Sequence, residues 1–173
     1  MHDGAFACYR MRLLLLSAVL CGLMPVGLAQ SATGSDAGST LATVKLSTAV
    51  RGRIESVALG YVPASERRAE AARTSIDRLK LGPGNRWVWE VISATCGAND
   101  CVYWLFDSTT GASLVDDAVG SEIFVLDTRH HGWRDSAVSG PISDCEVVTV
   151  YYQFDGRKYQ FAHRDEDKSA CDQ

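Results

Sequence analysis

From residue 86 to the C-terminus, short runs rich in β-branched and aromatic residues alternate with turn sequences. The runs are RWVWEVIS, CVYWLFD, ASLVD, SEIFVLD, DSAVS, EVVTVYYQFD and RKYQFA, and the turns between them include CGANDC, DAVG, HHGW, SGPISD and Asp155-Gly156. Turns this short leave no room for a crossover connection, so neighbouring strands must be antiparallel. We therefore expect a mainly β (α+β) chain whose antiparallel meander forms a sandwich, a barrel or part of a propeller.

The segment before residue 86 predicts one helix. Residues 63–84, PASERRAEAARTSIDRLKLGPG, begin with Pro and Ser start signals, repeat apolar residues at three- and four-residue steps, and end at Gly-Pro. Residues 41–62, LATVKLSTAVRGRIESVALGYV, are rich in β-branched residues and predict one or two strands with a bend near Gly52. The expected order is therefore strand, N-terminal helix, then meander.

The first 29 residues have the pattern of a secretory signal peptide. Two arginines precede the apolar run LLLLSAVLCGLMPVGLA, which is too short and too interrupted for a stable membrane span, and cleavage is expected near Ala29. Two alternatives remain open. Cys21 allows a lipoprotein signal, and translation starts at either Met1 or Met11. Residues 30–40, QSATGSDAGST, predict a flexible leader, and residues 41–173 a single β-rich domain.

The cysteines that remain after such cleavage are Cys96, Cys101, Cys145 and Cys171. The periplasm and the cell exterior are oxidising, so an even number of cysteines in an exported chain predicts two disulfides. Three pairings are possible, and CGANDC favours Cys96 with Cys101 across a tight turn and Cys145 with Cys171. The spacing matches neither a zinc site nor a C-x-x-C redox motif.

The charge of the chain bears on its partners. The formal net charge is -4, with no basic patch in the sequence, so binding to nucleic acid is not expected. An acidic exported protein associates faster with a basic partner protein, although the same acidity also serves solubility alone.

One segment, from Asp127 to Asp135, has the frame of a calcium-binding loop, with Gly132 at its sixth position. Arg129 and His131 stand where oxygen ligands are required, and a guanidinium group repels a cation. We therefore expect a metal-free hairpin turn in which Gly132 adopts a positive φ and Asp135 accepts hydrogen bonds from turn amides.

Neither a transition-metal site nor a catalytic site is expected. Adjacent His130 and His131 diverge on a strand, and His163 is not placed by spacing as a third ligand. Ser136, His130 and Asp135 form a triad only on paper, because no serine lies in a nucleophile elbow. We therefore predict no cofactor, no metal and no enzyme activity.

The run TRHHGWRDSAVSG followed by a β-run and FDGRKY resembles a C-terminal signature of small exported proteins of Gram-negative bacteria. It is also similar to the repeat of bacterial β-propellers. Proteins with related architecture include periplasmic lysozyme inhibitors and immunity proteins against peptidoglycan-cleaving toxins. The resemblance covers about residues 121–161, and it implies a hairpin in a protein that binds a cell-wall hydrolase.

These observations lead to one main hypothesis and two alternatives. The main hypothesis is a periplasmic or secreted inhibitor of a basic cell-wall hydrolase, whose binding residues are His130, His131, Trp133 and Arg134. A core position for Trp133 is an equal alternative. A second class is a glycan-binding or structural envelope module that uses Trp87, Trp89, Tyr103 and Trp104. A hydrolase is the third class, and it requires a histidine that meets both a carboxylate and a hydroxyl.

Overall fold

The computed structural model of the chain describes residues 30–31, 39–97 and 100–172, so the expected signal peptide lies outside the described residues. The helices are α1 (Thr48–Ala58), α2 (Arg67–Ala71) and the short 3-10 helix η1 (Ser169–Asp172). The described strands are β1 (Gln30–Ser31), β2 (Ser75–Leu79), β3 (Val88–Ile92), β4 (Cys101–Asp107), β5 (Ser113–Gly120), β6 (Glu122–His130), β7 (Trp133–Ser143), β8 (Glu146–Phe154) and β9 (Tyr159–Asp167).

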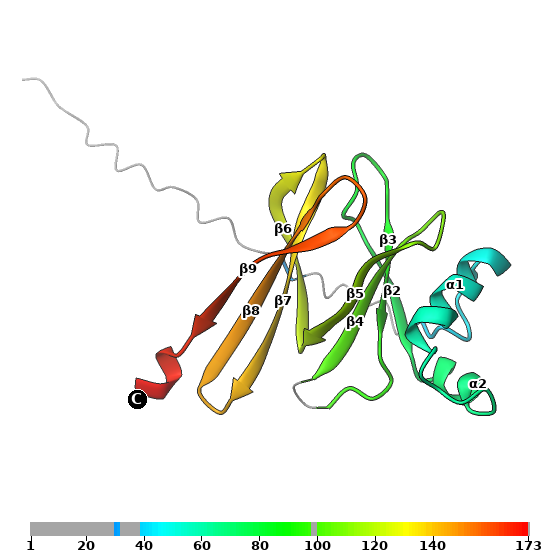
Figure 1. Cartoon of the computed structure of the whole chain (residues 1–173), viewed down its shortest axis with the longest axis horizontal. Helices are drawn as coiled ribbons and strands as arrows, with labels where there is room; N and C mark the ends of the chain where they lie inside the picture. The colour runs from blue at the N-terminus through cyan, green and yellow to red at the C-terminus, as the bar shows by residue number, and fades with distance from the viewer. Residues whose placement is uncertain (1–29, 32–38, 98–99, 173) are drawn as a thin grey trace, which may run out of the picture.

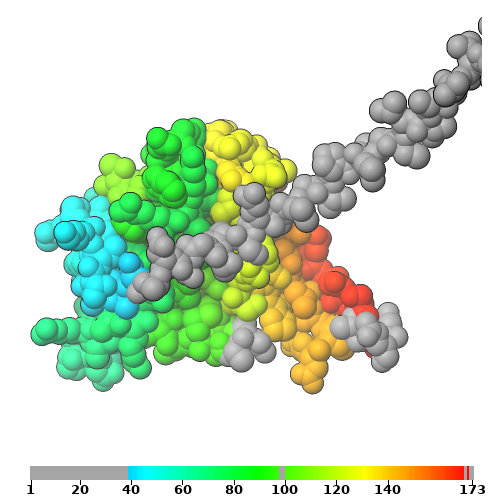
Figure 2. Space-filling model, turned by 180° about the vertical axis from the view of Figure 1, so that it is seen from behind, coloured from blue at the N-terminus to red at the C-terminus, as the bar shows by residue number. Residues whose placement is uncertain are grey.

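The strands form two antiparallel sheets that face each other in a sandwich-like arrangement, which is not a closed barrel. One sheet has the order β1-β6-β7-β8-β9 and the other the order β2-β3-β4-β5. The helices α1 and α2 lie beside the second sheet, on the side away from the first (Figure 1). Seen from behind, α1 lies at one edge and the yellow-to-red strands at the other (Figure 2). The expected mainly β meander is confirmed, with the sandwich as its form.

Alternation along the strands of the second sheet divides the apolar side chains between two cores. Val88 and Leu105 belong to the core between the sheets, together with Val138 and Phe154 of the first sheet. Trp89, next to Val88, belongs to the core beneath the helices, and so do the neighbours of Leu105 on β4. The second sheet is therefore apolar on both faces, which explains its near-continuous hydrophobic runs.

The prediction of strands over residues 41–62 is wrong for the part that forms α1. Ser47 caps this helix, since its Oγ accepts a hydrogen bond of 3.3 Å from the amide of Val50. Val50, Ile54 and Ala58 recur every four residues and are buried against the second sheet. Helical periodicity therefore outweighs the β-branched composition that predicted strands.

The predicted helix over residues 63–84 is also wrong beyond Ala71, because residues 75–79 form β2. Ile76 packs in the core beneath the helices, whereas Leu79 packs in the core between the sheets. A spacing of three residues places side chains on one face of a helix but on opposite faces of a strand. The spacing of Ile76 and Leu79 fits either a helix with one apolar face or a strand between two cores, so it does not distinguish the two.

Gln30 and Ser31, at the start of the expected leader, pair as β1 with Val125 and Phe124 of β6, while residues 32–38 lie outside the described residues. The DAVG sequence, expected as a turn, continues β5 through an irregular register in which Asp117 has a φ of 54°.

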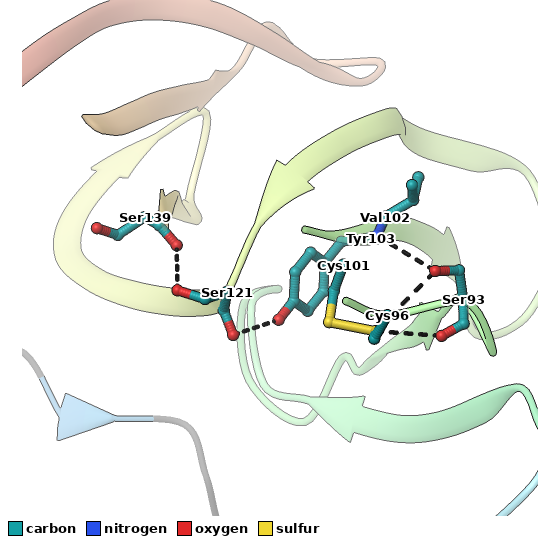
Figure 3. The surroundings of a disulfide bond; sticks show 7 residues. All are labelled: Ser93, Cys96, Cys101, Val102, Tyr103, Ser121 and Ser139. Carbon is teal, nitrogen blue, oxygen red and sulfur yellow. Dashed lines mark hydrogen bonds between the residues drawn. A yellow bond between two sulfur atoms is a disulfide. The ribbon is translucent and has the colours of Figure 1, made fainter. Parts of the chain in front are cut away.

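The two sheets are joined at a tight corner where β5 passes into β6. A Cβ atom added to Gly120 would lie 2.5 Å from Cγ1 of Val138, so only glycine fits there. Ser121, the one residue between the strands, donates its amide to the carbonyl of Ser139 at 2.8 Å. Its hydroxyl donates to the same carbonyl at 3.1 Å, and its own carbonyl accepts a hydrogen bond of 2.8 Å from the hydroxyl of Tyr103 (Figure 3). These bonds fix the second sheet to the first at this corner.

Two disulfides connect Cys96 with Cys101 and Cys145 with Cys171, which confirms the predicted pairing. The first bond closes the β3–β4 connection near the corner (Figure 3), and the second ties η1 to the β7–β8 turn. Among the described residues, no helix is long and apolar enough to cross a membrane.

Candidate functional site

The predicted turn at HHGW is confirmed as a two-residue hairpin loop. β6 ends at His130 and β7 begins at Trp133, leaving His131 and Gly132 as the loop. Their φ angles are 50° and 79°, the positive values of a type I′ turn. Gly132 adopts such values freely, whereas His131 has a backbone conformation that is uncommon for residues other than glycine.

Trp133 is a core residue of this hairpin. Its side chain is 5% exposed and its ring stacks on Phe154 with centroids 4.7 Å apart. The guanidinium group of Arg86 covers the ring, 4.9 Å from its centroid. The core alternative therefore describes this position, and the indole is not displayed at the surface as an interface anchor.

His130 and Asp135 form a side-chain pair across the hairpin. Nδ1 of His130 lies 2.8 Å from Oδ1 and 2.9 Å from Oδ2 of Asp135, whose carboxylate is buried. Asp135 was expected to accept hydrogen bonds from turn amides, but among the described residues its carboxylate is hydrogen-bonded to the imidazole of His130 instead. The contact orients the imidazole, which remains 44% exposed.

The triad considered on paper is only partly assembled. Ser136 is buried and opposes Val125 and Tyr152, while its neighbour Asp135 holds the imidazole. Within the described residues, no hydroxyl is hydrogen-bonded to His130. The described residues also include no group of three His, Cys, Asp or Glu side chains placed to hold a metal ion.

Arginines fix the flanks of the same turn. Nε of Arg134 donates to the carbonyl of Leu126 at 2.7 Å, and its Nη2 lies 2.7 Å from Oδ1 of Asp127. Nη1 of Arg129 donates to the carbonyl of Gly132 at 3.3 Å. Arg134 is therefore a brace within the hairpin, whereas Arg129 is exposed beside it.

A second turn, between β8 and β9, lies against the first. A Cβ atom added to Gly156 would lie 3.8 Å from Nδ1 of His131, so the two turns lie next to each other. Asp155 holds this second turn together by accepting bonds from the amides of Arg157 and Lys158 and from the side chain of Gln160. These hydrogen bonds, of which the one from the amide of Lys158 has the largest effect, lower the pKa of Asp155 to about 2.

The β2–β3 connection adds a third segment at this position. The amide of Arg134 donates to the carbonyl of Leu81 at 2.7 Å, and Arg86 covers Trp133 as described above. The hydroxyl of Tyr159 donates to the carbonyl of Arg134 at 2.7 Å, and burial, followed by the charge of Asp135, raises the pKa of Tyr159. We call the three segments, residues 80–87, 127–135 and 155–158, the turn end.

The turn end is cationic although the whole chain is acidic. It carries six Lys and Arg residues and three Asp residues, in addition to His130 and His131. One of the three carboxylates, that of Asp135, is buried beneath the imidazole. The β7–β8 turn and the end of β9, at the other end of the same sheet (Figure 1), carry Asp144, Glu146, Asp165, Glu166 and Asp167 against Arg164 and Lys168. Charge is therefore separated along the sheet.

The aromatic residues of β3 and β4 do not form an open surface. Trp89, Tyr103 and Trp104 are each at most 6% exposed and belong to the two cores, while Trp87 is 39% exposed. Core packing, the commoner use of such residues, therefore describes Trp89, Tyr103 and Trp104, and the four rings do not together present a sugar-stacking face. Both faces of this sheet are covered, one by the helices and one by the other sheet.

A buried acid, Glu90, was not predicted from the sequence. Its side chain lies in the middle of β3, 6% exposed, directly across from Asp77 on β2 and Leu105 on β4. Burial, followed by the charge of Asp77, raises the pKa of Glu90 to about 7. The alternation of Val88, Glu90 and Ile92 on one strand face is the signal that points to this position.

The chain matches no protein-family model, and searches of curated proteins and of solved structures find no match either.

Proposed function

We propose that the protein is an exported inhibitor of a cell-wall hydrolase and that it binds the enzyme through the turn end. The observation that carries this proposal is the cationic character of three contacting turns that are pinned to a rigid sheet. Backbone hydrogen bonds, the Trp133 stack and the His130–Asp135 pair hold these turns in one arrangement. A preordered loop binds with little further loss of conformational entropy.

The chemistry of the turn end suits an anionic cleft. Enzymes that cleave glycosidic bonds carry a pair of carboxyl groups that flank the scissile bond. Arg129, His131 and Arg157 are exposed at the turn end and able to donate hydrogen bonds to such carboxylates. His131 is presented at the tip of the two-residue loop, beside the turn that carries Arg157.

The charge separation gives a role to the rest of the acidic surface. A basic hydrolase is attracted at long range by the net charge of -4, while its catalytic cleft is matched by the cationic turn end. Long-range attraction of the partner and direct contact with its cleft are therefore assigned to different parts of this protein's surface. The two disulfides support a location in an oxidising compartment, for which we propose the periplasm or the cell exterior.

The test measures inhibition of a muramidase and of a peptidoglycan amidase by the purified protein without residues 1–29. The triple variant Arg129→Ala/His131→Asn/Arg157→Ala removes three exposed donors, and with them the bond of Arg129 to Gly132, but keeps the His130–Asp135 pair and the bonds of Arg134. Asparagine tolerates the positive φ of position 131. Wild-type protein should inhibit at least one enzyme, and the triple variant should raise the inhibition constant more than tenfold.

A matched control removes two positive charges outside the turn end. Lys45 and Arg68 are exposed, and they belong to the helical side of the molecule. The variant Lys45→Ala/Arg68→Ala should inhibit as the wild type does. Equal inhibition by the wild type and the triple variant would remove the turn end from the proposal, and no inhibition by the wild type would reject the function.

A further inference from the structure

The strand β9 forms an edge of the first sheet. In the part of the chain that the structure describes, it pairs only with β8 and is last in the order β1-β6-β7-β8-β9. Beyond Tyr159 its residues are exposed, apart from half-buried Ala162. An edge strand carries a row of backbone N–H and C=O groups that are available to another strand.

Acidic side chains alternate along this edge. Asp165 and Asp167 oppose Thr149 and Val147 of β8, so both carboxylates lie on one face of the ribbon. Asp167 accepts a hydrogen bond of 2.9 Å from the amide of Ser169, and Asp165 contacts Tyr151, the pKa of which is raised by burial first and then by that carboxylate. Each carboxylate retains further acceptor positions.

The basic residue of the same stretch is already neutralised. The guanidinium group of Arg164 is paired with the carboxylate of Glu166, which also lies 3.4 Å from Nζ of Lys168. These residues lie on the opposite face from Asp165 and Asp167. The face that carries the two aspartates therefore keeps a local negative charge.

The other face of this edge, which carries Arg164 and Glu166, also offers apolar surface. Phe161 is 62% exposed and opposes Tyr152, which packs against the core between the sheets. Val148 and Val150 continue the same face of β8 and are half-buried. A strand added beside β9 would cover this apolar surface with every second side chain.

We propose that β9 is a docking edge for an extended basic segment of a partner protein, which adds to the sheet as a further strand. Backbone hydrogen bonds supply the binding, alternate Lys or Arg side chains face Asp165 and Asp167, and the intervening side chains cover Phe161. This inference goes beyond the proposed function and does not depend on it, because it concerns a separate surface.

A second copy of the chain fits this edge poorly. Two identical antiparallel strands related by a twofold axis perpendicular to the sheet place one residue opposite its own copy at the centre. When that centre lies between His163 and Asp167, where every residue of β9 is ionisable, the central pair brings like groups together. The acidic edge therefore discriminates against itself and favours a basic strand.

The experiment uses two blocked nine-residue peptides as probes, one alternating Lys and Thr and the other alternating Glu and Thr. Each is titrated into the protein without residues 1–29 while backbone amide shifts and hydrogen exchange are recorded by NMR. The Lys–Thr peptide should shift the amides of residues 160–167 and slow the exchange of alternate ones. The variant Asp165→Asn/Asp167→Asn should bind it about fivefold more weakly.

The matched control is Glu66→Gln/Asp100→Asn, which removes two exposed negative charges from the other parts of the molecule. It should bind the Lys–Thr peptide as the wild type does, and urea unfolding should confirm that both variants are folded. Equal binding of the Glu–Thr peptide, shifts confined to other strands, or unchanged affinity of the Asp165→Asn/Asp167→Asn variant would overturn the proposal. Self-association through β9 in analytical ultracentrifugation would overturn it as well.

Discussion

Nδ1 of His130, the last residue of β6, contacts both oxygens of the buried Asp135 carboxylate in β7, at 2.8 and 2.9 Å. The pair lies directly behind the two-residue loop of His131 and Gly132. A buried carboxylate without a partner is costly, so this contact stabilises the part of the hairpin that displays the proposed binding residues.

Replacing His130 with Ala should therefore destabilise the protein by about 2 kcal/mol, since Asp135 loses the partner of its buried charge. Urea unfolding of the wild type and the variant measures this difference. In an Asp135→Asn background, the same His130→Ala change should cost less than about 1 kcal/mol, because no buried charge is left unpaired. Equal costs in the two backgrounds would show that the contact does not stabilise the fold.

The hairpin itself was predictable from sequence, whereas the His130–Asp135 pair was not. A histidine-glycine loop between two β-rich runs indicates a tight turn with positive φ. The β6–β7 register places His130 opposite Trp133 and therefore on the same face as Asp135, but the sequence does not show whether the two side chains meet. Beyond Arg129 the register shifts, so the faces of the earlier residues of β6 cannot be derived by counting from the turn. Local sequence does not reveal such a shift.

The sequence indicates the disulfides but not the assembly of the turn end. The disulfides were predictable because Cys96 and Cys101 flank one short turn, which leaves a single partner for each of the other two cysteines. The turn end was not, because residues 80–87 and 155–158 reach the HHGW loop through tertiary contacts alone. Its positive charge is hidden in a chain whose net charge is negative.

The backbone of His131 provides a second prediction. Its φ of 50° disfavours a β-branched side chain, so His131→Val should destabilise the protein by about 1–2 kcal/mol. His131→Asn should stay within about 0.5 kcal/mol of the wild type, because asparagine tolerates this conformation. Thermal unfolding of the two variants distinguishes them, and equal melting temperatures would contradict the positive φ.

The buried Glu90 predicts a dependence of stability on pH. Its pKa is raised from 4.5 to about 7 in the folded protein, so the folded state keeps a proton that the unfolded state releases. The free energy of unfolding should therefore fall as the pH rises from 4.5 to 7 and then level off, by on the order of 3 kcal/mol from this group.

The variant Glu90→Gln tests this contribution. It should match the wild type near pH 4 and be more stable than the wild type near pH 8, because glutamine does not ionise. Urea unfolding at several pH values provides the comparison. A fall in stability between pH 4.5 and 7 that is as steep in Glu90→Gln as in the wild type would assign the effect to other groups.

The two disulfides should contribute unequally. The Cys145–Cys171 bond spans 26 residues and the Cys96–Cys101 bond spans 5, so the first restricts the unfolded chain more. Replacing Cys145 and Cys171 with serine should lower the free energy of unfolding by about 3 kcal/mol, and replacing Cys96 and Cys101 with serine should lower it by about 2 kcal/mol. Urea unfolding of the two double variants measures the order, and a larger loss at Cys96–Cys101 would contradict it.

The central claim is that the turn end inhibits a cell-wall hydrolase, and its most direct test is the inhibition constant of the purified protein against a muramidase, measured for the wild type and for Arg129→Ala/His131→Asn/Arg157→Ala. The account predicts inhibition by the wild type, weakened by salt and more than tenfold weaker in the triple variant. A folded triple variant that inhibits as strongly as the wild type, or a wild type that inhibits neither muramidase nor amidase, would contradict it.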